Sequence, residues 1–166
     1  MQIHGFGISL ELPRGWEGLI LGGRHDIPPG AMSTPVVHAA NFALPPPHSA
    51  TAYGTNSVRR MAPGNAFLAL LEMNPNWAGV GLYSTAGFPQ LRPSDFSTAT
   101  LEVGLPGRVG VQRFVHVGGR AFIVYAVVAA KKIPFENEVA GLNSVLTSVS
   151  VAPPQKAYYY VSPTPA

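Results

Sequence analysis

The histidines are the side chains of this sequence with the clearest capacity for metal or acid–base chemistry. They are His4, His25, His38, His48 and His116. No two of them stand at His-x-His or His-x-x-x-His spacing, and the chain has no cysteine to complete a zinc site. A site would have to be assembled across strands, for instance from His38 and His116 with an acid. The sequence therefore predicts no metal site.

Motifs for covalent or phosphate chemistry are also missing from the sequence. No Gly-x-Ser-x-Gly turn is present. The Gly-Gly pairs at 22–23 and 118–119 lack the following helix and the lysine of a phosphate-binding loop. Glu72 ends an apolar segment and is the acid expected to be partly buried. With no second acid or histidine beside it, we expect Glu72 to meet an arginine or a backbone amide. We predict no catalytic residue, no cofactor and no enzyme activity.

Aromatic residues in two irregular segments are better candidates, because they suit protein contacts. One segment is a long loop over residues 74–97, and the other is a proline-bracketed tail over residues 152–166. An aromatic residue on a loop is either a binding anchor or folds back over the core. An extended tail either frays or adds to a sheet. The predicted partner-binding residues are Trp77, Phe88, Tyr158, Tyr159, Tyr160 and Val161.

The elements that must position these residues follow from hydrophobic periodicity. Strands are expected at 6–12, 19–21, 36–44, 67–71, 100–105, 109–117, 121–130 and 149–151. A short helix is expected at 57–62, and apolar residues at helical spacing predict a longer one at 135–149. The fold class is α+β: an antiparallel sheet of about six or seven strands, with one main C-terminal helix and one short helix packed on it. Residues 1–151 form one domain, and residues 152–166 form an extended Pro/Tyr-rich C-terminal tail.

Charge is scarce in this chain. Asp, Glu, Lys and Arg make up 11% of the residues, and the net charge is +3. The basic residues are scattered apart from the pairs Arg59-Arg60 and Lys131-Lys132, which argues against nucleic-acid binding. No apolar run reaches the ~20 residues that cross a bilayer. Residues 1–6 lack the features of an export signal, so we expect the cytoplasm, or a particle assembled there.

Residues 67–71 and 122–128 are apolar on both faces of the expected sheet. One main helix and one short helix cannot easily cover both faces. The part of the sheet that they leave uncovered must therefore lie under the long loop or against another subunit. We expect assembly with another subunit.

Leu12-Pro13-Arg14-Gly15-Trp16 resembles the Leu-Pro-x-Gly-Trp motif of the PsbP-like superfamily. That superfamily includes the PsbP, Mog-type Ran-binding, DcrB-like and Eag-type chaperone proteins. The order of elements over residues 5–151 is similar, including an apolar hairpin at 109–130 and a closing helix and strand at 141–151. The resemblance implies an antiparallel sheet with packed helices and mostly non-catalytic work, and it assigns no functional residue.

We therefore predict a non-enzymatic protein-interaction module: a structural subunit, adaptor or chaperone of a larger assembly. Its partner is a protein, and a second copy of the chain is one such partner. The alternative is a small-ligand carrier or an enzyme with a pocket under the 74–97 loop.

Overall fold

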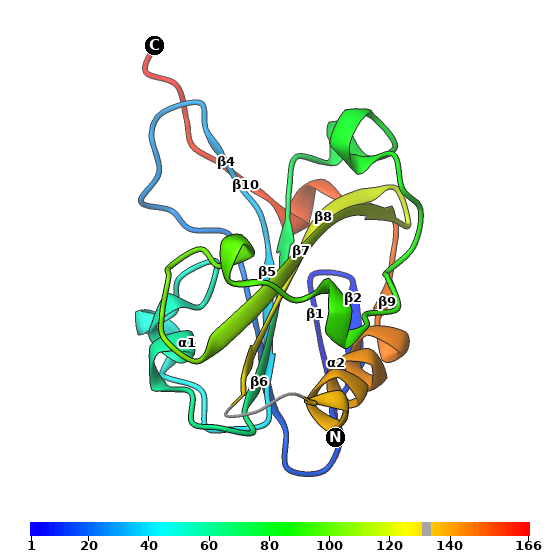
Figure 1. The fold of residues 1–166 in the computed structure, drawn as a ribbon. Helices are drawn as coiled ribbons and strands as arrows, with labels where there is room; N and C mark the ends of the chain where they lie inside the picture. Colours follow the sequence, from blue (N-terminus) through cyan, green and yellow to red (C-terminus); the bar gives the residue numbers. More distant parts are fainter. Residues whose placement is uncertain (131–133) are drawn as a thin grey trace.

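A five-stranded antiparallel sheet is the centre of the fold in the computed structural model, which describes residues 1–130 and 134–166 (Figure 1). In spatial order its strands are β3 (Glu17–Leu21), β5 (Val36–Ala40), β6 (Ala66–Glu72), β8 (Arg120–Ala129) and β7 (Arg108–Val117). The hairpin between β7 and β8 turns at Gly118 and Gly119, which both have positive φ angles. This two-glycine turn is confirmed as the sequence predicts it.

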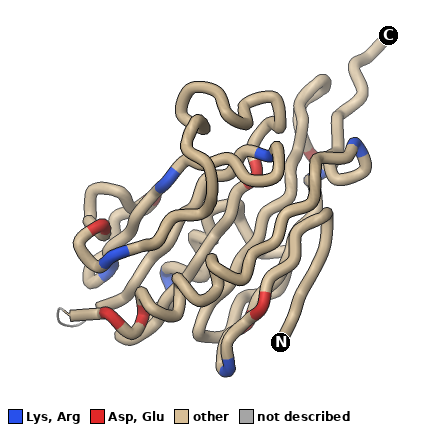
Figure 2. Tube along the Cα trace, turned by 90° about the vertical axis from the view of Figure 1, so that its right-hand side faces the viewer, with Lys and Arg blue, Asp and Glu red and all other residues tan. Residues whose placement is uncertain are grey.

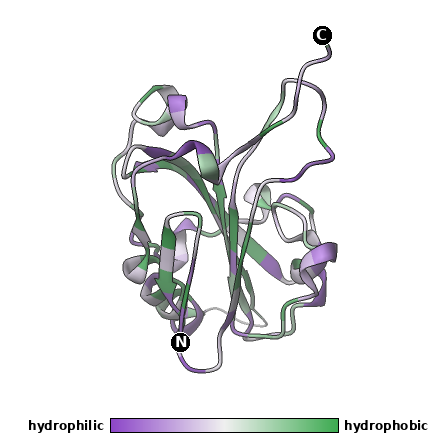
Figure 3. Cartoon of the chain, turned by 180° about the vertical axis from the view of Figure 1, so that it is seen from behind, coloured by the Kyte–Doolittle hydropathy of each residue, from purple (hydrophilic) through white to green (hydrophobic). Residues whose placement is uncertain are grey.

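The central strands β6 and β8 are buried at every residue, as expected for strands that are apolar on both faces (Figure 3). Alternate residues point to opposite sides of the sheet. Leu68 and Leu70 join the core cluster that includes helix α2 (Glu136–Ser148), and Phe67 and Leu71 join a second cluster. The predicted apolar stripe of α2 is confirmed. Its buried residues are Val139, Leu142, Val145 and Leu146.

The N-terminal segment forms a hairpin rather than the single strand expected at 6–12. Strands β1 (Gln2–Gly5) and β2 (Ile8–Glu11) pair with each other, and β9 (Ser150–Val151) adds to β2. Phe6 has a φ angle of 52° and Gly7 one of 72°, so the chain reverses between them. A non-glycine residue seldom adopts this conformation, and the alternation of apolar residues carries no sign of it.

The second face of the five-stranded sheet is covered by the chain itself, in part by the long loop, which is the first of the two covers expected from the sequence. Helix α1 (Thr55–Arg60) lies on the side of the sheet opposite α2 (Figure 1). Val58 of α1, Met61 directly after it and Tyr83 of the long loop are buried in the second cluster. Connecting segments with little regular structure therefore cover the face that the helices leave open.

The strand expected at 100–105 is absent from the structure. A 3₁₀ turn at Thr98–Thr100 leads into bends, and Leu101 and Leu105 pack against the second cluster. Their apolar alternation arises because these side chains lie on a sheet face, not because their backbone joins a ladder. The other 3₁₀ turns are Pro47–Ser49, Pro75–Trp77, Gly81–Tyr83, Pro93–Asp95 and Lys156–Tyr158.

The α+β class and the antiparallel pairing are confirmed, while the strands are distributed over three sheets. The third sheet is a ribbon of β4 (Met32–Ser33) and β10 (Tyr160–Val161), which the sequence does not predict. The Lys131-Lys132 pair lies outside the described residues.

Candidate functional site

Large apolar side chains gather on the surface at one end of the domain. Those classed as exposed among the described residues are Met1, Met32, Trp77, Val80, Leu82 and Val161. Met1 is at the N-terminus, away from the other five (Figure 1). The other five, which we call the apolar end, lie on the 75–83 loop and on the β4–β10 ribbon. Both segments project from the same end of the domain in Figures 1 and 3, the ribbon on one side and the 75–83 loop on the other.

The 75–83 loop is ordered by its own aromatic residues. Tyr83 is buried and packs edge-on against Phe114 of β7. The ring of Trp77 stacks on Tyr83 at a centroid distance of 6.0 Å, yet 47% of Trp77 remains exposed. Val80 and Leu82 are 64% and 70% exposed. Trp77 thus folds back in part while presenting apolar surface, together with two neighbours that the sequence analysis missed.

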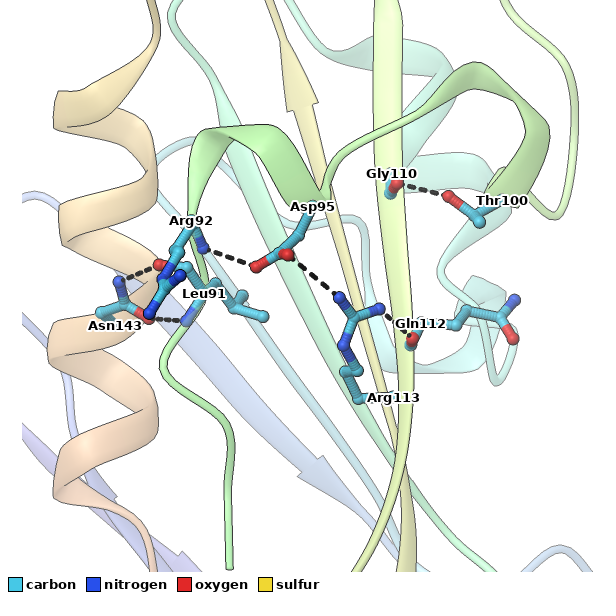
Figure 4. Close-up of polar contacts among 8 residues, drawn as sticks. All are labelled: Leu91, Arg92, Asp95, Thr100, Gly110, Gln112, Arg113 and Asn143. Carbon is cyan, nitrogen blue, oxygen red and sulfur yellow. Dashed lines mark hydrogen bonds and ion pairs between the residues drawn. The ribbon is translucent and has the colours of Figure 1, made fainter. Parts of the chain in front are cut away.

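Polar contacts fix the remainder of the long loop against β7 and α2 (Figure 4). Asn143 of α2 accepts a hydrogen bond from the Leu91 backbone N–H at 2.8 Å and donates one to the Leu91 carbonyl at 2.9 Å. Asp95 accepts a hydrogen bond from the Arg92 backbone N–H at 2.8 Å and lies 3.2 Å from Arg113 of β7. The loop therefore presents its apolar residues from a defined position.

Phe88 is not among the exposed large apolar residues. It is half-buried, and its ring packs against that of Phe122 in the main core at a centroid distance of 5.6 Å. Backbone hydrogen bonds join the adjacent Gly87 to the His116 carbonyl and the His116 N–H to the Thr85 carbonyl. We therefore leave Phe88 out of the proposed contact surface.

The tail lies on its own domain. Tyr160 pairs with Ser33 and Val161 with Met32 in the antiparallel β4–β10 ribbon. The Tyr160 ring lies on His25 with the centroids 3.8 Å apart. Val161 remains 54% exposed at this ribbon. The predicted tail residues therefore hold the segment in place, and Val161 also contributes to the apolar end.

A buried ion pair anchors the tail. Arg120 Nε donates to Glu72 Oε1 at 2.9 Å, its Nη2 donates to Oε2, and both side chains are fully buried. The Tyr159 hydroxyl donates to Glu72 Oε1 at 2.6 Å, and the Tyr158 ring lies 5.0 Å from the Arg120 guanidinium. Burial, together with the bond to the Glu72 carboxylate, raises the pKa of Tyr159. The expectation that Glu72 meets an arginine is confirmed, whereas the sequence offered no sign of the tyrosine.

The two histidines considered for a metal site occupy different strands and make ordinary contacts. Nε2 of His38 hydrogen-bonds to the Ala52 carbonyl at 3.0 Å, and burial lowers the pKa of this imidazole. His116 lies on β7, whose backbone bonds to the long loop. Within residues 1–130 and 134–166, no three histidine or acidic side chains gather as metal ligands. Over the same residues, no helix has the length and apolar character needed to cross a membrane.

Two surface pockets lie mostly outside the region beneath the 74–97 loop, where the ligand-binding alternative places one. One cavity of about 700 Å³ opens between the ends of β3, β4 and β6 and the 47–52 segment. A second, of about 710 Å³, lies between Glu11–Arg14 and α2 and is bordered by the long loop only at Gln90. In the first cavity the Ser33 and Thr34 hydroxyls already bond to the protein backbone.

Comparisons with protein-family models, curated proteins and solved structures found no match to this chain. The resemblance to the PsbP-like superfamily stays a prediction. One sequence signal points to the missed residues of the apolar end: no charged residue occurs between Glu72 and Arg92. The projecting loop accordingly carries no charge in Figure 2.

Proposed function

We propose that this chain is a protein-interaction module, a structural subunit or adaptor of a larger assembly that docks a protein partner through the apolar end. One observation carries the proposal: the exposed large apolar residues other than Met1, among the described residues, lie on two segments that project from the same end of the domain. Scattered apolar residues on a surface need no explanation, but a grouped set marks an interaction site.

The composition of the apolar end favours a protein partner over a lipid surface. The cores of protein interfaces are poor in charge and rich in aromatic residues and methionine, as at Trp77 and Met32. Membrane-surface segments instead usually combine apolar residues with lysine and arginine. The loop has neither between Glu72 and Arg92. Its fixed position also limits the entropy lost on binding.

Leu82 is the most exposed residue of the apolar end, at 70%, and burying a leucine side chain fully contributes about 1.5–3 kcal/mol. If a partner covers it, Leu82→Ser should weaken docking by about tenfold or more, since about 1.4 kcal/mol corresponds to a factor of ten. Because the side chain points into solvent, the substitution should leave the free energy of unfolding nearly unchanged.

Site-specific photo-crosslinking in cells of the source organism tests the proposal. A photoreactive residue at position 82 and another at position 161 should give the same protein adduct. The matched control is position 147, where Thr147 is exposed on α2 at the other end of the domain. Leu82→Ser should reduce the adduct formed from position 161.

Equal crosslinking from positions 82 and 147 would contradict the proposal. So would co-sedimentation of the wild-type chain with lipid vesicles that Leu82→Ser abolishes, because that result assigns the apolar end to a membrane. An adduct of twice the chain mass identifies a second copy as the partner, and light scattering over a dilution series then gives the dissociation constant.

A further inference from the structure

The tail is held by groups that lie far from it in the sequence. We call residues 156–162 the tail segment, and the surface that receives it, formed by Gly7, His25, Met32–Ser33, Glu72 and Arg120, the socket. The tail's anchoring contacts are the Tyr159–Glu72 hydrogen bond, the Tyr158 ring over Arg120, the Tyr160 ring on His25 and the two pairs with β4. Each contact therefore depends on where the tail segment lies, not on the path of the chain leading to it.

The socket selects one register of the tail segment. A Cβ atom added to Gly7 would lie 2.7 Å from the Tyr158 ring, so only glycine leaves room for that ring. The buried Glu72 carboxylate already takes two bonds from Arg120 and offers Oε1 to the Tyr159 hydroxyl. The Tyr159 hydroxyl reaches this carboxylate only when the tail segment lies in this register.

The residues that lead into the tail segment are lightly attached. Pro153, Pro154 and Gln155 are exposed, and the two prolines have no N–H to donate. The firm contacts of this stretch are at Ala152, whose N–H donates to the Gly7 carbonyl at 2.7 Å and whose carbonyl accepts from Arg120 at 3.3 Å. Three extended residues span about 10 Å, enough to redirect the tail segment while Ala152 stays in place.

We propose that the tail segment exchanges between two copies of the chain, each socket receiving the tail segment of the other copy. Exchange replaces every anchoring contact by an identical one, so the balance depends on the effective concentration of the chain's own tail, in the millimolar range for short flexible linkers. Crowding of copies within an assembly shifts the balance toward the exchanged form. The partner is a second copy, and the proposal does not depend on what binds the apolar end.

The natural chain has no cysteine, which makes a disulfide test direct. Met32 and Val161 are cross-strand partners, and directly opposed residues of antiparallel strands have Cα atoms about 4.5–5.5 Å apart, within disulfide range. The full-length single variants Met32→Cys and Val161→Cys are mixed, unfolded, refolded together at high concentration and oxidised. The control mixture contains Met32→Cys and Thr147→Cys, which reports random collision. The double variant Met32→Cys/Val161→Cys, oxidised at low concentration, verifies that the chain folds and the pair closes.

Exchange predicts an interchain disulfide in the first mixture at a yield at least about tenfold above the control, because docking raises the local concentration of the two thiols. Adding Tyr159→Phe to the Val161→Cys chain should leave that yield nearly unchanged, because the same hydrogen bond to Glu72 is lost whichever socket holds the tail segment. Equal yields in the two mixtures, with rapid closure of the double variant, would overturn the proposal, since the tail segment would then dock only within its own chain.

Discussion

Tyr159→Phe removes one hydroxyl and leaves the ring, so it isolates the contact between the tail and Glu72. The hydroxyl lies 2.6 Å from Glu72 Oε1, and the carboxylate is fully buried. A hydrogen bond to a charged group contributes about 1.5–3 kcal/mol. Glu72 keeps both bonds from Arg120, so the substitution leaves no unpaired buried charge, and Tyr159 is partly exposed. We therefore expect the substitution to lower the free energy of tail detachment by an amount at the lower end of this range, about 1.5 kcal/mol.

That loss should appear as release of the tail rather than unfolding of the domain. A change of about 1.5 kcal/mol raises the population of the detached tail roughly tenfold. Limited trypsin digestion measures the population of the detached tail. Cleavage after Lys156, which lies in the tail segment, requires local opening. When opening and closing are fast relative to cleavage, the cleavage rate follows the open population. The rate of cleavage after Lys156 should rise about tenfold in Tyr159→Phe.

Two controls make this measurement specific. Tyr160→Phe removes the neighbouring hydroxyl but keeps the ring that lies on His25, so its rate of cleavage after Lys156 should match the wild type. Cleavage after Arg14, an exposed residue in the turn between β2 and β3, should be equal in all three chains. Equal rates after Lys156 for the two Tyr→Phe variants would refute the reasoning, because the ribbon alone would then hold the tail.

Two further predictions concern the core. The pKa of His38 is lowered because the side chain is buried. Near pH 6.5 the unfolded chain therefore binds a proton at His38 that the folded chain does not bind. The free energy of unfolding should fall as pH drops below about 6.5, by at most about 1.4 kcal/mol per pH unit, and urea titrations should lose this slope in His38→Gln. Gly54 has a φ angle of +65°, and Gly54→Ala would place a Cβ atom 2.1 Å from Cζ of the buried Phe67 ring. We therefore expect the free energy of unfolding to fall by about 2–4 kcal/mol. Gly79→Ala, at a positive φ angle but with open space around it, should lose only about 1–2 kcal/mol, and equal losses in thermal melts would show that the Phe67 contact is unimportant.

The parts of the fold that sequence reasoning predicts well are those with a local cause. Helix α2 has an apolar stripe at helical spacing, and β6 and β8 have the continuous apolar composition of buried strands. The hairpin at Gly118 and Gly119 follows from two residues that tolerate positive φ angles. In each case, the pattern and the structural requirement lie within one short stretch of the chain.

The parts that it misses depend on contacts between distant segments. Apolar alternation at 100–105 predicts a strand, but Leu101 and Leu105 pack as a loop because the sheet face beneath them needs covering. The pairing of Tyr159 with Glu72 spans 87 residues. The same is true of the candidate site: Trp77 and the tail tyrosines were predicted, but Arg120 was not, because its role depends on a neighbour in space.

With both sheet faces covered by the chain itself, the apolar residues left for a partner are those of the apolar end. Val161 belongs both to this end and to the tail segment, so both the docking of a partner and the exchange of the tail segment involve this residue. A substitution elsewhere can still distinguish the two processes. Leu82→Ser should weaken docking without changing the interchain disulfide yield. If Leu82→Ser impaired both processes equally, exchange and docking would be a single event, in which the partner of the apolar end is the copy that receives the tail.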